Sequence, residues 1–338
     1  MKRAVVAVAA VALVAASAAY ATKPGSGSST GTARVFAPNP VQDLGIQTLT
    51  DQKDAAGAVA AAAYHPVTLT DLDGSGYLSG KWAVIRSETG SPAYSPTNTF
   101  LYDRQQDQFE QVMAYYWITE AQRYIQSLGF GRSLRPVNMR PQAVRINQWG
   151  ADNSFATDKQ DEIRFGKGGV DDAEDAEVIL HEYGHAIHFA QGFQFSTEQA
   201  GAISEGFGDY WAVTVTEVVG KRLGVASPDP ACVADWDSTS YTSSVPHCLR
   251  RLDEGKTFPA DLVGEVHADG EIWSQALWTI RNAIGNVKAD TVILEGQFGF
   301  DGDTMPALAA DIVAAAKSLF GQGTASAVTA AFHARGIL

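Results

Sequence analysis

Two histidines and a glutamate stand close together in the segment His181-Glu182-Tyr183-Gly184-His185. On a helix, His181 and His185 lie on one face, so both imidazoles can bind a single metal ion. Glu182 then points into the same cleft, where its carboxylate can accept a proton from water. The spacing predicts a hydrolytic metal centre, provided that a third ligand follows at a usable distance.

A third ligand is expected on the next helix. A helical pattern from about Thr197 to Val219 contains Glu205, which lies 20 residues beyond His185. That is enough chain to end one helix, turn, and lay a second helix antiparallel beside it. Two imidazoles and one carboxylate, with a fourth position left to water, commonly hold catalytic zinc. We therefore expect one zinc ion on His181, His185 and Glu205.

Asp209 lies one helical turn after Glu205, on the same face. Its carboxylate can accept a hydrogen bond from the far nitrogen of a ligand imidazole, which fixes the tautomer and orients the ring. The alternative is a solvated acidic face. The neighbours Phe207, Tyr210 and Trp211 argue against it, because they indicate a mostly buried helix in which unpaired carboxylates are costly.

The helix around His181 has recognisable ends. Acidic residues between Asp171 and Glu177 are expected in its first turns, where the helix dipole favours negative charge. Gly192 is expected to end it. His188 and Gln191 stand where a metzincin would have glycine and histidine, so that class is excluded and His188 is expected to be structural or surface-exposed.

The beginning of the chain has the pattern of a secretory signal. Lys2 and Arg3 precede an alanine- and valine-rich run that is too short for a confident membrane span. Ala19 to Ala21 supplies a cleavage site, with Ala16 to Ala18 as an alternative. We expect residues 1–21 to be removed and the product to be soluble, without a membrane span, and secreted or periplasmic.

Charge and cysteine content narrow the possible partners. Without residues 1–21 the chain has 23 basic and 38 acidic side chains, so nucleic acid is not expected as a partner because its phosphates would be repelled. In an exported protein, Cys232 and Cys248 most simply form one disulfide; two free buried thiols are the alternative. The sequence does not indicate an oligomeric state.

The sequence before the helix that carries His181 predicts short strands and one long helix. Strands are expected at Val67–Leu69, Trp82–Ile85 and Val144–Trp149, with a helix at Tyr102–Leu128. Segments 153–155 and 162–165 resemble an edge hairpin, and an edge strand beside a catalytic cleft can pair with an extended peptide.

Two segments before residue 99 are expected to have a structural rather than a catalytic role. Residues 23–34 are rich in Gly, Ser and Thr and are expected to form a flexible tether. Asp71 to Gly76 resembles the front half of a calcium loop, but Trp82 stands where the loop needs glutamate. A tight turn is therefore expected there, and calcium, although possible, is not supported.

Together, these residues resemble a known enzyme family. The metal motif with Glu205 and Asp209 is similar to that of thermolysin-like gluzincin metallopeptidases, and the flanking sequence is closest to their fungalysin-type branch. Val266–Trp273 is similar to the segment that carries the family's transition-state histidine, and the last helices are similar too. The resemblance covers roughly residues 100–338.

The resemblance implies an α+β, thermolysin-like fold, with the active-site helix between a β-rich N-terminal part and a mainly helical C-terminal part. The expected divisions are a signal peptide at 1–21, a tether and β-rich segment at 22–98, an N-terminal catalytic subdomain with the zinc-binding helix at 99–196, and a helical C-terminal catalytic subdomain at 197–338.

The resemblance also implies roles. Glu182 would be the general base and acid, His267 would hydrogen-bond the developing oxyanion, and Asp209 would orient a zinc histidine. Asn153 would help to hold substrate. Arg250 would bind a substrate carbonyl, with the next residue, Arg251, equally plausible.

Three departures from the family bear on function. The tyrosine usually found shortly after the second zinc histidine is absent, as is an aspartate five residues before His267, where Leu262 stands beside Asp261. Fewer than about eighty residues are left for a propeptide. We expect a secreted zinc endopeptidase acting on peptides or proteins; the alternatives are a zinc-binding scaffold with weak or no turnover, or a zinc hydrolase of short peptides.

Overall fold

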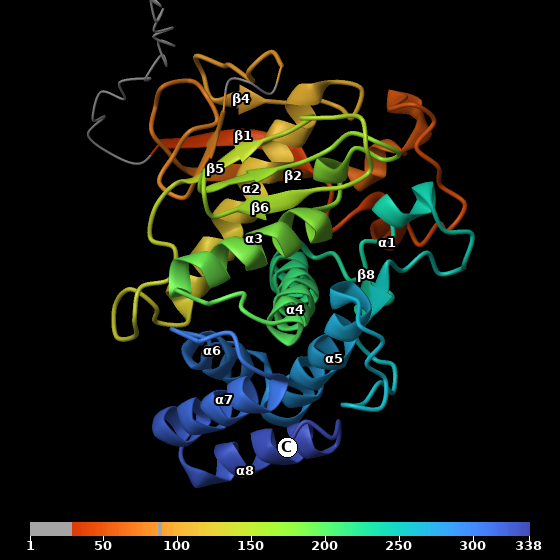
Figure 1. Ribbon diagram of the computed structural model, residues 1–338. Coiled ribbons are helices and arrows are strands. Elements are labelled where there is room, and N and C mark those ends of the chain that lie inside the picture. The colour runs from red at the N-terminus through yellow and green to blue at the C-terminus, as the bar shows by residue number, and fades with distance from the viewer. Residues whose placement is uncertain (1–28, 87–89) are drawn as a thin grey trace, which may run out of the picture.

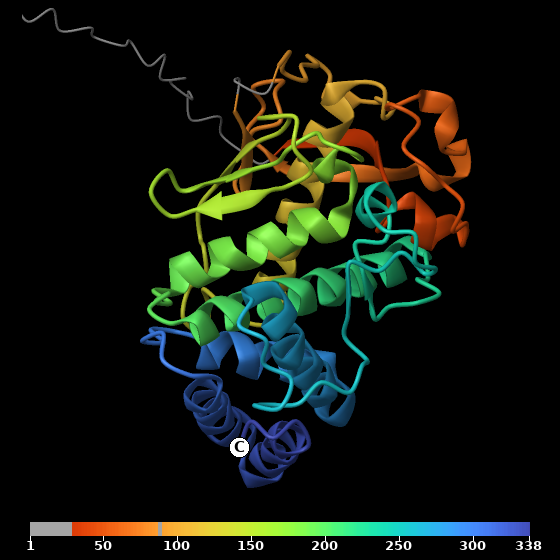
Figure 2. The same ribbon diagram turned by 45° about the vertical axis from the view of Figure 1, so that its right-hand side comes forward.

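The computed structural model describes residues 29–86 and 90–338 of the chain (Figure 1). The expected signal segment, residues 1–21, lies outside the described residues. Most of the strands gather at one end of the molecule and the C-terminal helices form the other end, with long helices between them (Figures 1 and 2). The α+β class predicted from the sequence is confirmed.

The chain alternates short strands and helices in its first half and is helical in its second half. The helices and strands are, in order, β1 (Ser29–Val35), α1 (Pro40–Leu44), β2 (His65–Leu72), β3 (Ala83–Ile85), β4 (Thr99–Phe100), α2 (Asp107–Ser127), β5 (Gln142–Arg145), β6 (Phe155–Thr157), β7 (Glu162–Arg164), α3 (Ala176–Gln191), α4 (Glu198–Leu223), β8 (Cys232–Val233), β9 (Arg250–Arg251), α5 (Val266–Ile284), α6 (Asn286–Gly296), α7 (Met305–Phe320) and α8 (Gln322–His333). Short 3-10 helices lie at η1 (Ala56–Ala58), η2 (Ala61–Ala63), η3 (Asp172–Glu174) and η4 (Asp237–Ser240).

The strands form three small sheets. In the first, of order β2-β1-β4, β1 is antiparallel to β2 and parallel to β4. In the second, of order β3-β5-β7-β6, only the β6–β7 pair is antiparallel. This pair is the predicted hairpin, and β6 is at the edge of its sheet. The third sheet pairs β8 with β9.

The predicted tether is wrong from residue 29 onward. Ser29–Val35 is β1, which pairs along its length with β2 and buries Ala33 and Val35 in the core. Every second side chain of this strand is buried, and there is no continuous hydrophobic run. Its small Gly, Ser and Thr residues give it the composition of a linker. The segment from residue 29 therefore belongs to the folded body of the protein.

The turn at Asp71–Gly76 begins within the last two residues of β2. Asp71, Gly74 and Gly76 have positive φ angles, and Asp73 accepts a hydrogen bond from the backbone N–H of Ser75 at 2.8 Å. This is the geometry of a tight turn closed by its own aspartate.

The long aromatic helix α2 is buried on almost all sides. Its predicted span, Tyr102–Leu128, contains the observed one, Asp107–Ser127. Polar residues between the aromatic ones are buried as well; Gln122, for example, donates to the carbonyl of Val137 at 2.9 Å. It is therefore a central helix rather than one with a solvated face.

The start of α3 differs from the prediction. The helix begins at Ala176, and Asp175 caps it by accepting a hydrogen bond from the backbone of Glu177. Asp172 to Glu174 form the separate turn η3, so the acidic residues before Asp175 are not in the first turn of the helix. At the other end Gly192, with φ 73°, ends the helix as predicted.

Helices α4 to α8 make up the C-terminal half, and α4 packs against both α3 and α5. Within the described ranges, no helix combines the length and the apolar character that crossing a bilayer requires. The site described next lies where α3, α4 and the start of α5 meet the edge strand β6.

Candidate active site

The two long helices α3 and α4 run antiparallel against each other. His181 contacts Asp209, whereas His188, further along α3, contacts Ser204, which is earlier on α4. The predicted helix, turn and antiparallel helix are therefore present, and they bring the two halves of the expected zinc site together.

Two glycines allow this close approach. A Cβ atom on Gly184 would lie 2.9 Å from the Cα atom of Gly208, and a Cβ on Gly208 would lie 2.7 Å from Nδ1 of His181. Both distances are too short for non-bonded atoms. The glycines thus set how near Glu205 comes to the two histidines.

The three expected ligands converge. Nε2 of His181 lies 3.2 Å from Oε2 of Glu205, and Nε2 of His185 lies 3.6 Å from Oε1 of the same carboxylate. Two ligands that are about 2.1 Å from a tetrahedral ion lie about 3.4 Å apart, so these separations fit zinc. Oε2 of Glu205 is also buried without a hydrogen bond, as expected of an atom that awaits a cation.

Asp209 contacts Nδ1 of His181, the ring nitrogen that faces away from Glu205. Its Oδ1 lies 2.9 Å from Nδ1 of His181, and the carboxylate is fully buried. Nε and Nη2 of Arg250 donate to the same carboxylate at 2.6 and 2.7 Å. Burial opposes the charge of Asp209, but Arg250 and His181 outweigh it and lower the pKa of Asp209 to about 2. The arrangement leaves Nε2 of His181 facing Glu205 and the cavity.

Ser204 holds His185 in a comparable way, and the sequence did not predict it. The Ser204 hydroxyl lies 2.8 Å from Nδ1 of His185 and 2.9 Å from Nδ1 of His188. His188 is fully buried and stacks on Phe193 and Phe207, with ring centroids 4.1 and 4.6 Å away. His188 is therefore structural, one of the two roles expected for it.

The charges around the ligands balance without a metal. Burial opposes the protonation of His181, but the carboxylates of Asp209 and Glu205 outweigh it and raise the pKa of His181 to about 10. Burial lowers the pKa of His185 to about 4. The pKa of Glu205 lies well below its usual value because the histidines outweigh its burial. An arriving cation must displace the proton on His181.

Glu182 is buried beside the ligands. Its Oε2 has no hydrogen-bond partner, and burial raises its pKa to about 7. One atom each of His181, Glu182 and His185 lie within 4.8 Å of one another. A carboxyl group with a pKa near neutrality, next to the position of a metal ion, is suited to exchange protons with water.

His267 lies at the start of α5 and reaches the site from the third helix. Its Nε2 is 3.5 Å from Oε2 of Glu205, and its side chain is 54 % exposed. Nδ1 lies 2.6 Å from Oε1 of Glu265, the N-cap residue of α5. Asp261, the acidic neighbour considered from the sequence, binds Thr257 instead. Glu265 therefore has the orienting contact, only two residues from His267.

A cavity of about 520 Å³ surrounds these residues. Asn153 and the following residues of β6 form one wall, with Asn153 exposed. Phe189 and Phe195 also line the cavity, and Tyr241 lines it from the loop after η4. The position of Tyr241 in this cavity was not predicted from the sequence.

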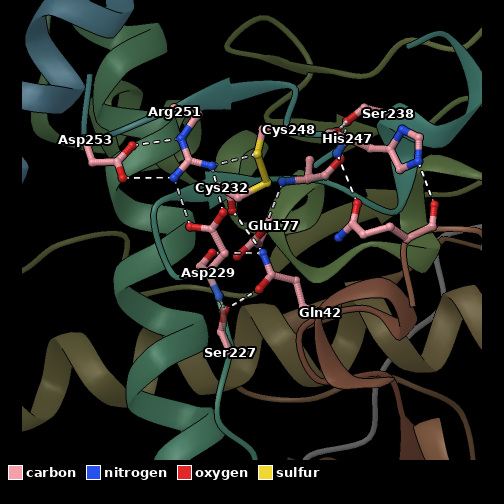
Figure 3. The surroundings of a disulfide bond; sticks show 12 residues. Gln42, Glu177, Ser227, Asp229, Cys232, Ser238, His247, Cys248, Arg251 and Asp253 are labelled. Atoms are coloured by element: carbon pink, nitrogen blue, oxygen red, sulfur yellow. Dashed lines mark hydrogen bonds and ion pairs between the residues drawn. A yellow bond between two sulfur atoms is a disulfide. The ribbon is translucent and has the colours of Figure 1, made fainter. Parts of the chain in front are cut away.

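The structure separates Arg250 from Arg251. Arg250 lines the cavity, but its Nε and Nη2 donate to Asp209, which leaves Nη1 for a substrate carbonyl. Arg251 instead forms ion pairs with Asp229 and Asp253 and is not among the lining residues (Figure 3). Of the two arginines, Arg250 is the one that lines the cavity.

The disulfide between Cys232 and Cys248 is present, as predicted (Figure 3). Cys232 is on β8, and β8 pairs with β9, which carries Arg250. The disulfide thus restrains the segment in which Arg250 contacts Asp209.

Comparisons with known proteins give one informative result. No protein-family model matches the sequence. No curated protein matches it either. Among solved structures, a precursor of protealysin, a metalloproteinase from Serratia proteamaculans, matches with a TM-score of 0.53 and 17% sequence identity, over 68% of this chain and 79% of that chain. The chain has the fold of that metalloproteinase precursor.

This likeness confirms the thermolysin-like α+β fold. It does not distinguish the fungalysin-type branch, which stays a prediction. At 17% identity it shows the fold alone, so the activity is argued from the residues of the site.

Proposed function

We propose that this chain is an exported zinc endopeptidase. The observation that carries the proposal is the convergence of two imidazole nitrogens on one carboxylate, 3.2 and 3.6 Å away, at the wall of a cavity that also contains Glu182. Three protein ligands with an open side are typical of catalytic zinc sites, whereas structural sites are closed by four.

Zinc would be held by Nε2 of His181, Nε2 of His185 and the carboxylate of Glu205. When bound, the ion would polarise a peptide carbonyl and lower the pKa of water toward neutrality. Asp209 and Ser204 keep the two rings turned toward the ion, since each binds the far nitrogen, Nδ1.

Glu182 moves the proton. Its buried, unpartnered Oε2 accepts a proton from the attacking water and later delivers it to the departing amine. In the metal-free protein burial raises the pKa of Glu182 to about 7, and a bound zinc ion would favour the charged form, which accepts the proton.

His267 stabilises charge on the substrate. In its protonated form His267 donates from Nδ1 to Glu265, 2.6 Å away, and has a second N–H at Nε2 that can donate to the carbonyl oxygen as negative charge develops there. The donor is in place before the reaction, so little reorganisation is needed. The missing tyrosine leaves His267 as the main side-chain donor in this account.

The peptide would lie along the edge strand β6. Strand β6 pairs with β7 on one side only, and Asn153, just before it, lines the cavity. An extended peptide can hydrogen-bond to such an edge. The disulfide supports export, since disulfides persist mainly in oxidising compartments.

The proposal is tested by incubating the purified protein with casein and a quenched peptide library. We expect internal cleavage that a zinc chelator abolishes, that added zinc restores, and that Glu182→Gln lacks. Bound zinc without any chelator-sensitive cleavage would contradict the proposal and favour a scaffold role. Release of terminal residues only would favour a hydrolase of short peptides.

A further inference from the structure

Three aspartates meet in the same cavity, away from the expected zinc ligands. Asp152 precedes β6, Asp172 begins η3 and Asp237 begins η4, so they come from three separate segments. One carboxylate oxygen of each lies within 4.8 Å of the others. All three line the cavity that contains His181 and Glu182.

Two of these carboxylates are buried and only half satisfied. Asp172 is 2% exposed and Asp237 is 5% exposed. Asp172 accepts a hydrogen bond from Ser154 through Oδ2, and Asp237 accepts one from Tyr241 through Oδ2 at 2.9 Å. Oδ1 of each is buried without a partner. Buried carboxylate oxygens without partners are rare unless a ligand completes them.

The cluster has no cation of its own. In the described part of the chain, no lysine or arginine forms an ion pair with any of the three. Arg250 lines the same cavity, but Asp209 neutralises it. Burial raises the pKa of Asp152 to about 6 and that of Asp172 to about 7. The site is therefore short of positive charge.

The shape of the site suits a long side chain with a charged tip. Val178, Val233 and Leu249 line the cavity and can cover an aliphatic stem. Gly169 lies against the aspartates, and only glycine fits there, because a Cβ atom at this position would lie 2.5 Å from Oδ2 of Asp152. Lysine and arginine combine an apolar stem with a cationic head in this way.

We propose that Asp152, Asp172 and Asp237 bind the cationic head of a lysine or arginine of the peptide substrate, at one fixed position beside the cleaved bond. This inference rests on the proposed peptidase function. An ammonium has three N–H donors, which three carboxylate oxygens can accept, and a guanidinium has five. Calcium would need six to eight oxygen ligands, more than these three aspartates supply as single ligands.

Cleavage mapping tests the position. The zinc-loaded full chain is incubated with a proteome-derived peptide library, and the cut sites are read by mass spectrometry. We expect lysine or arginine at one position flanking the cut. The double variant Asp172→Asn with Asp237→Asn should lose that preference, whereas Asp158→Asn, at an exposed position on the turn after β6, should keep it.

Peptide binding tests the proposed subsite without requiring catalytic turnover. Two peptides that differ only in lysine against norleucine are titrated into zinc-loaded Glu182→Gln protein. We expect about tenfold or greater tighter binding of the lysine peptide, and near-equal binding when the two aspartates are also replaced. The double variant should unfold at the same temperature as wild type or higher, because it lacks like-charge repulsion, so a folding defect would be visible.

The outcomes separate this inference from the proposed function. Cleavage without a basic preference, together with equal peptide binding, would overturn the subsite and leave the peptidase standing. Absence of cleavage would overturn the peptidase, and the binding comparison would still decide the subsite. One equivalent of Ca²⁺ bound by wild type but not by the double variant, with equal binding of both peptides, would show a metal site instead.

Discussion

Each of the two proposed zinc histidines has a different kind of residue at the ring nitrogen that faces away from the proposed ion. His181 faces a buried carboxylate, Asp209, whereas His185 faces a neutral hydroxyl, Ser204. For Nε2 of His185 to accept a metal ion, the proton must lie on Nδ1, which then donates to Ser204. The Ser204 hydroxyl can accept that hydrogen bond and still donate to Nδ1 of His188, so its position is compatible with the tautomer that binds metal.

Ser204→Ala should weaken zinc binding by about 10-fold to 100-fold, because the partner that orients a ligand imidazole is lost. The dissociation constant is measured by competition with a chromophoric chelator. Ser318→Ala, on an exposed part of α7, is the matched control and should bind zinc as wild type does. Equal affinities for the two variants would show that Ser204 does not orient His185.

The proposed ligands were predictable from the sequence, but not all of the residues that contact them. His181, His185 and Glu205 follow from spacing, because a helix fixes which residues share a face. Ser204 and Glu265 were not predicted, since a serine within a helix or an acidic residue at a helix start occurs in many proteins without any metal site nearby. Asp172 was read as part of a helix turn, although its carboxylate lies in the cavity.

At the scale of elements, the approach of α3 to α4 sets the geometry of the metal site. Gly184 and Gly208 face each other where the helices meet, and any side chain at either position would meet the opposite helix. Close helix contacts of this kind need residues without side chains, since packed interiors have no spare volume.

Gly208→Ala should destabilise the protein by about 1 to 3 kcal/mol and weaken zinc binding, because the new methyl group would lie 2.7 Å from Nδ1 of His181. Thermal unfolding and zinc competition check both effects. Gly323→Ala is the control: it lies in α8 with open space around it and should be neutral or slightly stabilising. A Gly208→Ala protein with wild-type stability and affinity would contradict the account.

The long helices were predictable and the short strands were less so. Periodic apolar residues and Gly192 predicted α3 closely, because these signals are local. Strand β1 depends on pairing with β2 and β4, which are far along the chain, and its composition resembles a linker. Such long-range pairing is not visible in a local pattern.

The whole molecule is acidic, with a net charge of −13, and much of that charge is buried. Burial raises the pKa of Asp172, Glu174 and Asp235 to about 7 each. These groups therefore bind protons more tightly in the folded state than in the unfolded state. Their contribution to stability is present below about pH 4 and is lost as the pH rises to about 7.

The metal-free protein should therefore melt at a higher temperature at pH 5.5 than at pH 8. Calorimetry with a chelator present measures the midpoint at each pH. The lowered pKa values of His185, about 4, and of His188 act in the opposite direction below about pH 6.5, but these two histidines are outnumbered by the buried acids with raised pKa values. A midpoint that rises from pH 5.5 to pH 8 would show that the buried acids do not govern the stability of this form.

We propose that one zinc ion on His181, His185 and Glu205 supports peptide hydrolysis through Glu182. The most direct measurement is a titration of zinc into the metal-free protein while cleavage of a quenched peptide is followed. We predict activity that rises linearly and levels off at one equivalent, and a Glu182→Gln variant that binds the same equivalent with activity about 100-fold to 10,000-fold lower. Hydrolysis without zinc, or undiminished hydrolysis by Glu182→Gln, would contradict the claim.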